Sequence, residues 1–214
     1  MNRYIDIHAH HQGSDTVENI FPSNAKSAFE QRPLQLFSLG LHPWHIKADF
    51  EEELRLIEIY STQKQVVAIG ETGLDKLCKT PLAIQREVFQ RQIHISQACK
   101  KPLVIHCVKM VDDLLEIKKR SKNTQAWILH GFRGNAKQVQ QLLSHGFYIS
   151  FGLQYSKETL MKTPLERLFL ETDETAIPIE NHYEKVVEIL NIDEQALCCQ
   201  ISDNFDGVFG KILF

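Results

Sequence analysis

Four histidines and two carboxylic acids stand at or near the ends of short apolar runs in this chain. They are His8, His10, Glu71, His106, His130 and Asp173. Because alternate residues of a strand point to the same face, His8 and His10 can aim at one point. Neutral imidazole and carboxylate are side chains that hold zinc and related divalent ions. The recurrence of this pattern predicts a metal site built from several strand ends.

Six such groups suit two adjacent divalent ions, and Glu71 is well placed to bridge them. The imidazole-rich set favours zinc, manganese, iron or cobalt over magnesium, which prefers oxygen ligands and water. Two metal ions about 3.5–4 Å apart can share a water molecule, lower its pKa and polarise a phosphoryl or carbonyl oxygen. Asp173 could ligate a metal ion and also accept the proton of that water. We therefore expect a hydrolase with Glu71 and Asp173 as catalytic residues and two divalent ions (zinc, manganese or magnesium) as cofactors.

The apolar runs that position these residues alternate with segments of helical periodicity. We expect strands over residues 4–10, 16–21, 34–41, 66–69, 102–106, 126–131, 147–151 and 167–173. Helices are expected over residues 50–57, 81–99, 111–119 and 136–143, and in the tail from about residue 180. Asp49, Thr80 and Asn135 are the expected helix caps. Residues 22–33 show no clear periodicity, and we expect them to be irregular.

Strands that alternate with helices predict βαβ units and a mostly parallel sheet. The strands are almost continuously apolar, which indicates that both faces of the sheet are covered. Seven or eight strands fit a (β/α) TIM-type barrel that spans residues 1–214 as a single domain. Functional residues of such barrels lie at the carboxyl ends of the strands. All six candidate residues stand there, so we expect them to meet at one mouth.

Composition limits the partners that this protein can have. The 214 residues have a formal net charge of −3, which excludes a global basic field for wrapping long nucleic acids but leaves room for a local phosphate site. Five cysteines, two of them adjacent, do not form a disulfide framework. No apolar run approaches membrane-spanning length, and the first residues lack the apolar region of a signal peptide. We expect a cytoplasmic protein without membrane contact or an obligate protein partner.

The remaining polar residues favour ordinary roles. His42 and His45 are expected at the rim, and three residues are candidate substrate contacts: His42, Lys109 and Arg133. Lys109 and Arg133 could hold a substrate phosphate, although solvation at the surface explains them equally well. Four further histidines are expected on the solvated surface, namely His11, His94, His145 and His182. We expect Cys107 in the core and the charge run 118–122 on a solvated helix face.

Seven motifs in order resemble those of the TatD family of metal-dependent hydrolases. They are Asp-Ile-His-Ala-His (6–10), Gly-Leu-His-Pro (40–43), Ala-Ile-Gly-Glu-Thr-Gly-Leu-Asp (68–75), Pro-Leu-Val-Ile-His (102–106), His-Gly-Phe-Arg-Gly (130–134), Tyr-Ile-Ser-Phe-Gly (148–152) and Glu-Thr-Asp (171–173). Gln85, Phe89 and the pair Asn204–Phe205 also fit the family pattern. The resemblance covers nearly the whole chain.

The resemblance implies a distorted TIM barrel of the amidohydrolase type with a two-metal site. By motif, one ion would be held by His8, His10 and Asp173. The other would be held by His106 and His130, and Glu71 would bridge both. Members of the family are known as deoxyribonucleases with 3′ exonuclease action on single strands. We therefore expect phosphodiester hydrolysis, with DNA ends or a small phosphoester as the substrate.

The chain departs from the family pattern at three places. Cys107-Val-Lys109 replaces the usual Arg-Asp or Arg-Glu pair after the histidine of the fourth motif, and Glu174 and Thr175 replace a small residue and a proline. Residues 12–33 are too few for the usual elements, so the first barrel helix is expected to be reduced or missing. The changed pocket walls leave open a small ester, amide or phosphomonoester as the substrate. A metal-stabilised binding protein without turnover is the least favoured alternative, because all six candidate residues are present.

Overall fold

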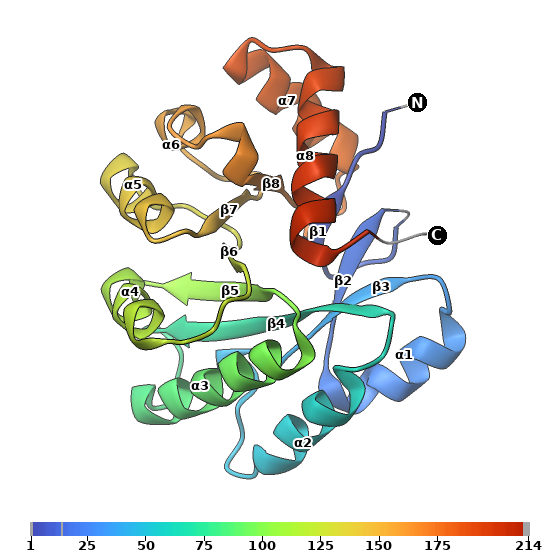
Figure 1. Cartoon of the computed structure of the whole chain (residues 1–214), viewed down its shortest axis with the longest axis vertical. Coiled ribbons are helices and arrows are strands. Elements are labelled where there is room, and N and C mark those ends of the chain that lie inside the picture. The colour runs from blue at the N-terminus through green and yellow to red at the C-terminus, as the bar shows by residue number, and fades with distance from the viewer. Residues whose placement is uncertain (1, 14, 212–214) are drawn as a thin grey trace.

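Eight parallel strands in chain order form one sheet that curls into a nearly closed barrel (Figure 1). The structure is a computed structural model that describes residues 2–13 and 15–211. The strands are β1 (Asp6–Ala9), β2 (Thr16–Ile20), β3 (Leu36–Leu39), β4 (Val66–Asp75), β5 (Leu103–Val108), β6 (Trp127–Leu129), β7 (Tyr148–Phe151) and β8 (Leu168–Leu170). The predicted TIM-type barrel is therefore confirmed.

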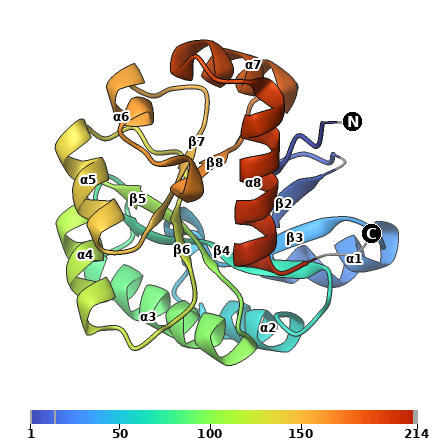
Figure 2. The ribbon, with the colours of Figure 1, turned by 45° about the horizontal axis from the view of Figure 1, so that its top comes forward.

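Helices surround this barrel and cover its outer face (Figure 2). They are α1 (Ala25–Gln31), α2 (Glu51–Tyr60), α3 (Leu82–Cys99), α4 (Val111–Arg120), α5 (Ala136–Ser144), α6 (Lys157–Met161), α7 (Ile179–Leu190) and α8 (Glu194–Phe209), with 3₁₀ turns at Pro22–Asn24, Pro43–His45 and Leu165–Arg167. The described residues between β1 and β2 contain no helix, which confirms that the first barrel helix is missing. Among residues 2–13 and 15–211, no helix is long and apolar enough to cross a membrane.

The barrel closes between β1 and the segment that follows β8. The Asp173 N–H donates to the His8 carbonyl at 3.0 Å, and the His10 N–H donates to the Asp173 carbonyl at 3.0 Å. Just before β1, the Tyr183 hydroxyl of α7 accepts a hydrogen bond from the Ile5 N–H at 3.1 Å and donates one to the Ile5 carbonyl at 3.0 Å. Two backbone hydrogen bonds and the hydroxyl of one tyrosine thus close the barrel.

Two glutamines of α3 fix the loops that lead into the mouth. Gln92 bonds to both backbone groups of Leu41, at 2.8 and 3.0 Å, beyond β3. Gln85 bonds in the same way to Asp75 at the end of β4, at 2.8 and 3.0 Å. Both amides are fully buried, on the same helix as the buried apolar residues Phe89 and Ile93. The helix therefore positions the ends of two strands as well as packing against them.

Strand β4 is longer than the sequence indicates. We expected it to end at Ile69, but it continues through two glycines to Asp75. A Cβ atom added to Gly70 would lie 2.5 Å from the Val104 carbonyl oxygen, and one added to Gly73 would lie 2.0 Å from that of His106. The glycines therefore allow β4 and β5 to approach closely where Glu71 emerges.

Some local expectations are wrong. Residues 22–33 form a 3₁₀ turn and α1, whose buried face contains only Ala25 and Ala28, so their apolar periodicity is weak. The helices α2 and α3 begin after Phe50 and Pro81 rather than at Asp49 and Thr80 caps. The short helix α6 was not expected. The capping box at Asn135 is present as predicted.

Three residues expected on the solvated surface are partly or fully buried, namely His11, Lys118 and His182. The ammonium of Lys118 lies 4.5 Å from the centre of the Trp127 ring, and its partial burial lowers its pKa to about 8. His182 is fully buried against Tyr155, with ring centres 5.5 Å apart. His11 is half-buried and bonds to the Thr172 hydroxyl at 3.0 Å. Lys118 and His182 stand on helices and His11 follows β1, and contacts with other parts of the chain cover all three.

Candidate metal centre

A cavity of about 650 Å³ opens at the carboxyl ends of the strands. The predicted ligands gather there, five in its lining and His8 buried behind them. The three predicted substrate contacts also line this cavity, namely His42, Lys109 and Arg133. Lys109 and Arg133 are exposed, whereas His42 is buried beside Glu71 rather than exposed at the rim. The structure therefore brings the predicted site residues together at one mouth, and their roles stay predictions.

The carboxylate of Glu71 lies between two groups of histidines. Its Oε2 atom is 3.4 Å from Nε2 of His8 and 3.8 Å from Nε2 of His10. Its Oε1 atom is 2.7 Å from Nε2 of His130, 2.9 Å from Nδ1 of His106 and 3.2 Å from Nε2 of His42. Each oxygen therefore faces a different set of imidazoles, as a bridging ligand requires.

The group on the Oε2 side has the spacing of a metal site. The Oδ1 atom of Asp173 is 3.7 Å from Nε2 of His8 and 3.5 Å from Nε2 of His10. Two ligands of one tetrahedral ion with bonds of about 2.1 Å lie about 3.4 Å apart. Both ring nitrogens of His8 are buried without a hydrogen-bond partner among the described residues. A divalent ion between these side chains would satisfy Nε2 of His8, which faces both carboxylates, so the residues fit the group.

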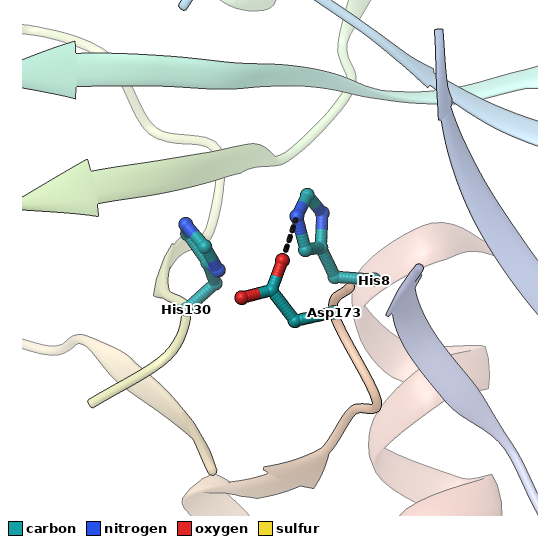
Figure 3. A group of neighbouring side chains, drawn as sticks. All are labelled: His8, His130 and Asp173. Atoms are coloured by element: carbon teal, nitrogen blue, oxygen red, sulfur yellow. Dashed lines mark ion pairs between the residues drawn. The ribbon is translucent and has the colours of Figure 1, made fainter. Parts of the chain in front are cut away.

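His130 also lies close to this site. Figure 3 shows His8, His130 and Asp173 as neighbouring side chains, with the ion pair between His8 and Asp173 drawn as a dashed line. The His8 and His130 rings are 4.3 Å apart between centres, and these three residues form one of the candidate ligand groups. The family motif pairs His130 with His106 instead. The His130 side chain therefore lies close to both groups.

Two carboxylates fix the ring orientation of His106 and His130. Nε2 of His106 is 3.2 Å from Oδ2 of Asp75, and Nδ1 of His130 is 3.2 Å from Oε1 of Glu171. A histidine that donates one N–H to a carboxylate presents the lone pair of its other nitrogen. In both rings that other nitrogen faces Glu71. Both rings are therefore oriented to ligate.

His42 differs from His106 and His130 because its proton, rather than its lone pair, faces Glu71. Its Nδ1 atom accepts a hydrogen bond from the backbone N–H of Trp44 at 3.1 Å. A neutral His42 therefore has its proton on Nε2, the atom that faces Glu71. Nε2 lies within 4.8 Å of the ligand atoms of Glu71 and His106, but an N–H is a donor and not a metal ligand. The geometry makes His42 a hydrogen-bond donor into the cavity.

Charges in the site are strongly coupled. Burial by itself raises the pKa of Glu71, but the charge of His130 and the hydrogen bonds from His106, His130 and His42 hold it well below its usual value. Burial by itself lowers the pKa of His130, but the charges of Glu71 and Glu171 raise it well above its usual value. Burial and the neighbouring His8 lower the pKa of His10. Without a metal, His130 is therefore protonated, and ligation by this ring releases a proton.

Three carboxylates that support the site were not among the predicted site residues. Glu171 is fully buried and accepts hydrogen bonds from the Gly131 N–H at 2.7 Å and from the Ser150 hydroxyl. Asp75 accepts from the Trp44 indole at 2.6 Å. Asp6, whose pKa burial raises to about 6, accepts from Thr172. All three stand inside the recognised motifs, so their motif positions were the available signal.

The chain matches the family model described as TatD related DNase over residues 14–210. It is 33% identical over 196 residues to a metal-dependent hydrolase of Buchnera aphidicola, covering 81% of this chain and 74% of that protein. It is 32% identical over 160 residues to the metal-dependent hydrolase YabD of Bacillus subtilis, covering 71% of this chain and 63% of that protein. It is 36% identical over 148 residues to the human 3′-5′ RNA nuclease TATDN2, covering 64% of this chain and 19% of that protein.

Solved structures show the same fold. YJJV, a TatD homologue of Escherichia coli, superposes with a TM-score of 0.85 over 98% of both chains at 19% identity. A hydrolase of the TatD family from Entamoeba histolytica superposes with a TM-score of 0.79 over 98% of this chain and 99% of that chain, at 18% identity. The family model matches almost the whole sequence, and the barrel is shared with solved members of the same family. The chain belongs to the TatD family of metal-dependent hydrolases.

Proposed function

We propose that this protein is a two-metal phosphodiesterase that removes nucleotides from the 3′ ends of single-stranded DNA. The observation that supports it most is the Glu71 carboxylate, whose two oxygens face separate sets of histidines. The family description names a DNase, and the human relative is named a 3′-5′ RNA nuclease. The same barrel end also offers two exposed cations for phosphate.

The proposed ligand sets follow the two sides of Glu71. His8, His10 and Asp173 would hold one ion, and His106 and His130 would hold the other. Glu71 would be shared by both. When bound, two divalent ions supply Lewis-acid charge for the phosphate and lower the pKa of a water molecule.

Three kinds of side chain would then complete the reaction. Asp173, whose side chain is 28% exposed at the cavity, would accept the proton of the attacking water. His42 would donate its Nε2–H to a phosphoryl oxygen, because the Trp44 backbone fixes its tautomer. Lys109 and Arg133 would neutralise the phosphates at the mouth.

One feature favours a smaller substrate as the second candidate function. Glu174 lines the cavity where the family pattern has a small residue. Its negative charge would repel a further phosphate of a nucleic-acid strand. The second candidate is therefore hydrolysis of a small ester, amide or phosphomonoester by the same centre. The cytoplasmic location, the single domain and the lack of an obligate protein partner stay predictions.

The test is nucleotide release from a single-stranded DNA oligomer with and without added zinc, manganese or magnesium. Labels at the 5′ and the 3′ end distinguish the direction of removal, and an RNA oligomer of the same sequence tests the sugar. Glu71→Gln, which keeps the size of the side chain, is the control and should abolish release with the fold intact. Metal-dependent release that persists in Glu71→Gln would refute the bridging role. Absence of release from either polymer would favour the second candidate.

A further inference from the structure

Trp44 is an exposed aromatic residue that is nevertheless firmly anchored. Its side chain is 61% exposed, although it stands in a 3₁₀ turn directly after buried Pro43. Its indole N–H donates to Oδ2 of Asp75 at 2.6 Å, and its backbone N–H donates to His42 at 3.1 Å. Polar ends of tryptophan side chains are usually bonded when the ring body is buried. In Trp44 the indole N–H is hydrogen-bonded although much of the ring remains exposed to solvent.

The ring lies beside the candidate metal centre. Its centre is 5.0 Å from that of His42 and 5.9 Å from that of His106. Phe21 and His45 line the same cavity, with ring centres 4.6 Å apart and ring planes tilted by 36°, and Phe21 is 37% exposed. Aromatic rings and cationic side chains therefore line the same cavity as the candidate ligands.

We propose that Trp44 is the stacking platform for the nucleobase next to the reacting phosphate, so that the site selects phosphoesters with a base attached. This inference rests on the proposed function, because it names the substrate part that the same site recognises. Stacking on an aromatic ring requires no particular base edge, since every base has a flat π face. The platform would therefore favour nucleotides over base-free phosphoesters without favouring one sequence.

The competing role for Trp44 is purely structural. Its indole N–H could serve only to hold Asp75, which in turn orients His106. In that case, loss of the ring would weaken the binding of every phosphate compound to the site equally. A platform affects only ligands that contain a base, so the two roles make different predictions.

The test measures binding of three phosphates to the zinc-loaded protein: deoxycytidine 5′-monophosphate, cytidine 5′-monophosphate and 2-deoxyribose 5-phosphate. Trp127, the other tryptophan, is fully buried, so quenching of fluorescence by a stacked base reports on Trp44. Both nucleotides should quench the fluorescence of Trp44, and their dissociation constants should lie within a few-fold of each other. The base-free phosphate should bind about tenfold to a hundredfold more weakly.

Substitutions of Trp44 distinguish the stacking role from the structural role. Calorimetric titration measures the affinity of each variant for the three phosphates. Trp44→Leu should weaken the binding of both nucleotides about tenfold to a hundredfold and leave the affinity for 2-deoxyribose 5-phosphate unchanged. Trp44→Phe keeps an aromatic face but loses the indole N–H, so it should retain most of the preference for a base. Leu77→Ala is the matched control, because Leu77 is 66% exposed and does not line the cavity.

Other outcomes would overturn the proposal in distinguishable ways. If the nucleotides and the base-free phosphate bind equally well, the platform is refuted while the proposed function stands. If Trp44→Leu weakens all three phosphates alike, the residue acts through Asp75 and His106. If none of the three binds, the proposed function itself fails, and the platform fails with it.

Discussion

The backbone of Asp173 donates a hydrogen bond to the carbonyl of His8, and the side chains of the same two residues face each other at 3.7 Å. The same two residues thus close the barrel through their backbones and contribute side chains to the candidate metal site. A ligand that holds the side chains together also holds β1 against the segment after β8. Metal binding and barrel closure are therefore expected to be thermodynamically coupled.

Added metal should raise the melting temperature of the apoprotein. A ligand present at about a hundredfold its dissociation constant stabilises the folded state by about 2.7 kcal/mol. For a domain of this size, that corresponds to a shift of about 5–10 °C. Calorimetric scans of chelator-treated protein, with increasing zinc or manganese, measure the effect, and elemental analysis should find about two ions per chain. No shift and no specific uptake for any tested metal would contradict the metal centre.

Asp173→Asn should reduce kcat by at least about a hundredfold, because the amide cannot accept the proton of the water. The backbone of Asp173 has φ of 55°, a conformation that asparagine tolerates, so the bridge to β1 should persist. The measurement is kcat of the metal-loaded variant together with its circular dichroism. Asp112→Asn, on the exposed face of α4, is the control and should keep the activity. Activity of Asp173→Asn within a few-fold of the unsubstituted protein would exclude the proposed base.

Asp75→Asn should weaken metal binding through His106 without removing a ligand. An amide in this position no longer secures the tautomer of the ring, and loss of such a partner costs about 10–100-fold in metal affinity. Titration of metal into the apoprotein measures the loss, and Glu171→Gln should have a comparable effect through His130. Asp203→Asn, exposed on α8, should change nothing. Unchanged affinity in both buried variants would show that the carboxylates do not orient the rings.

The meeting of the candidate ligands at one mouth could be predicted because each stands at or near the end of an apolar run, and parallel strands of a barrel end at one mouth. The role of Asp75 could not be predicted in this way. Its partners are Trp44 and His106, which approach it only after β3, β4 and β5 have paired. The tautomer of His42 likewise depends on a backbone N–H in a 3₁₀ turn. Hydrogen-bond partners across elements are a property of the packed molecule.

His182 shows a prediction that the sequence did permit. It shares one helix face with Ile179, Tyr183 and Val186, at spacings of three, four and seven residues, and all four are buried. The periodicity therefore placed it in the core, although its residue type suggested the surface. Tyr183 lies on the same face, but its bonds to Ile5 join residues 178 positions apart, which no local pattern indicates.

Tyr183→Phe should destabilise the protein by about 1–3 kcal/mol, because the buried N–H and carbonyl of Ile5 lose their hydrogen-bond partner. The midpoint of urea unfolding should fall while its slope stays constant. Tyr148→Phe removes a hydroxyl from a half-buried tyrosine and should cost less than about 0.5 kcal/mol. Equal effects of both substitutions would show that the hydroxyl of Tyr183 does not stabilise the barrel closure.

His182 should make the protein less stable in mild acid. Burial lowers the pKa of His182 to about 4 from its ordinary value of 6.5, against the opposing influence of Glu171. Between these values the unfolded chain binds more protons than the folded one, so stability is complete above pH 6.5 and decreases as the pH falls toward 4. The loss attributable to this one residue is about 2 kcal/mol at pH 5.

His182→Phe removes the titrating group and keeps a ring to pack on Tyr155. The variant should gain about 2 kcal/mol relative to the unsubstituted protein when the pH is lowered from 8 to 5. Urea unfolding at both pH values, with a chelator present throughout, measures this difference while the other histidines titrate equally in both proteins. His94→Phe, on the exposed face of α3, is the matched control and should show no such gain. If His182→Phe gained no more than His94→Phe, the buried imidazole would titrate as it does in the unfolded chain.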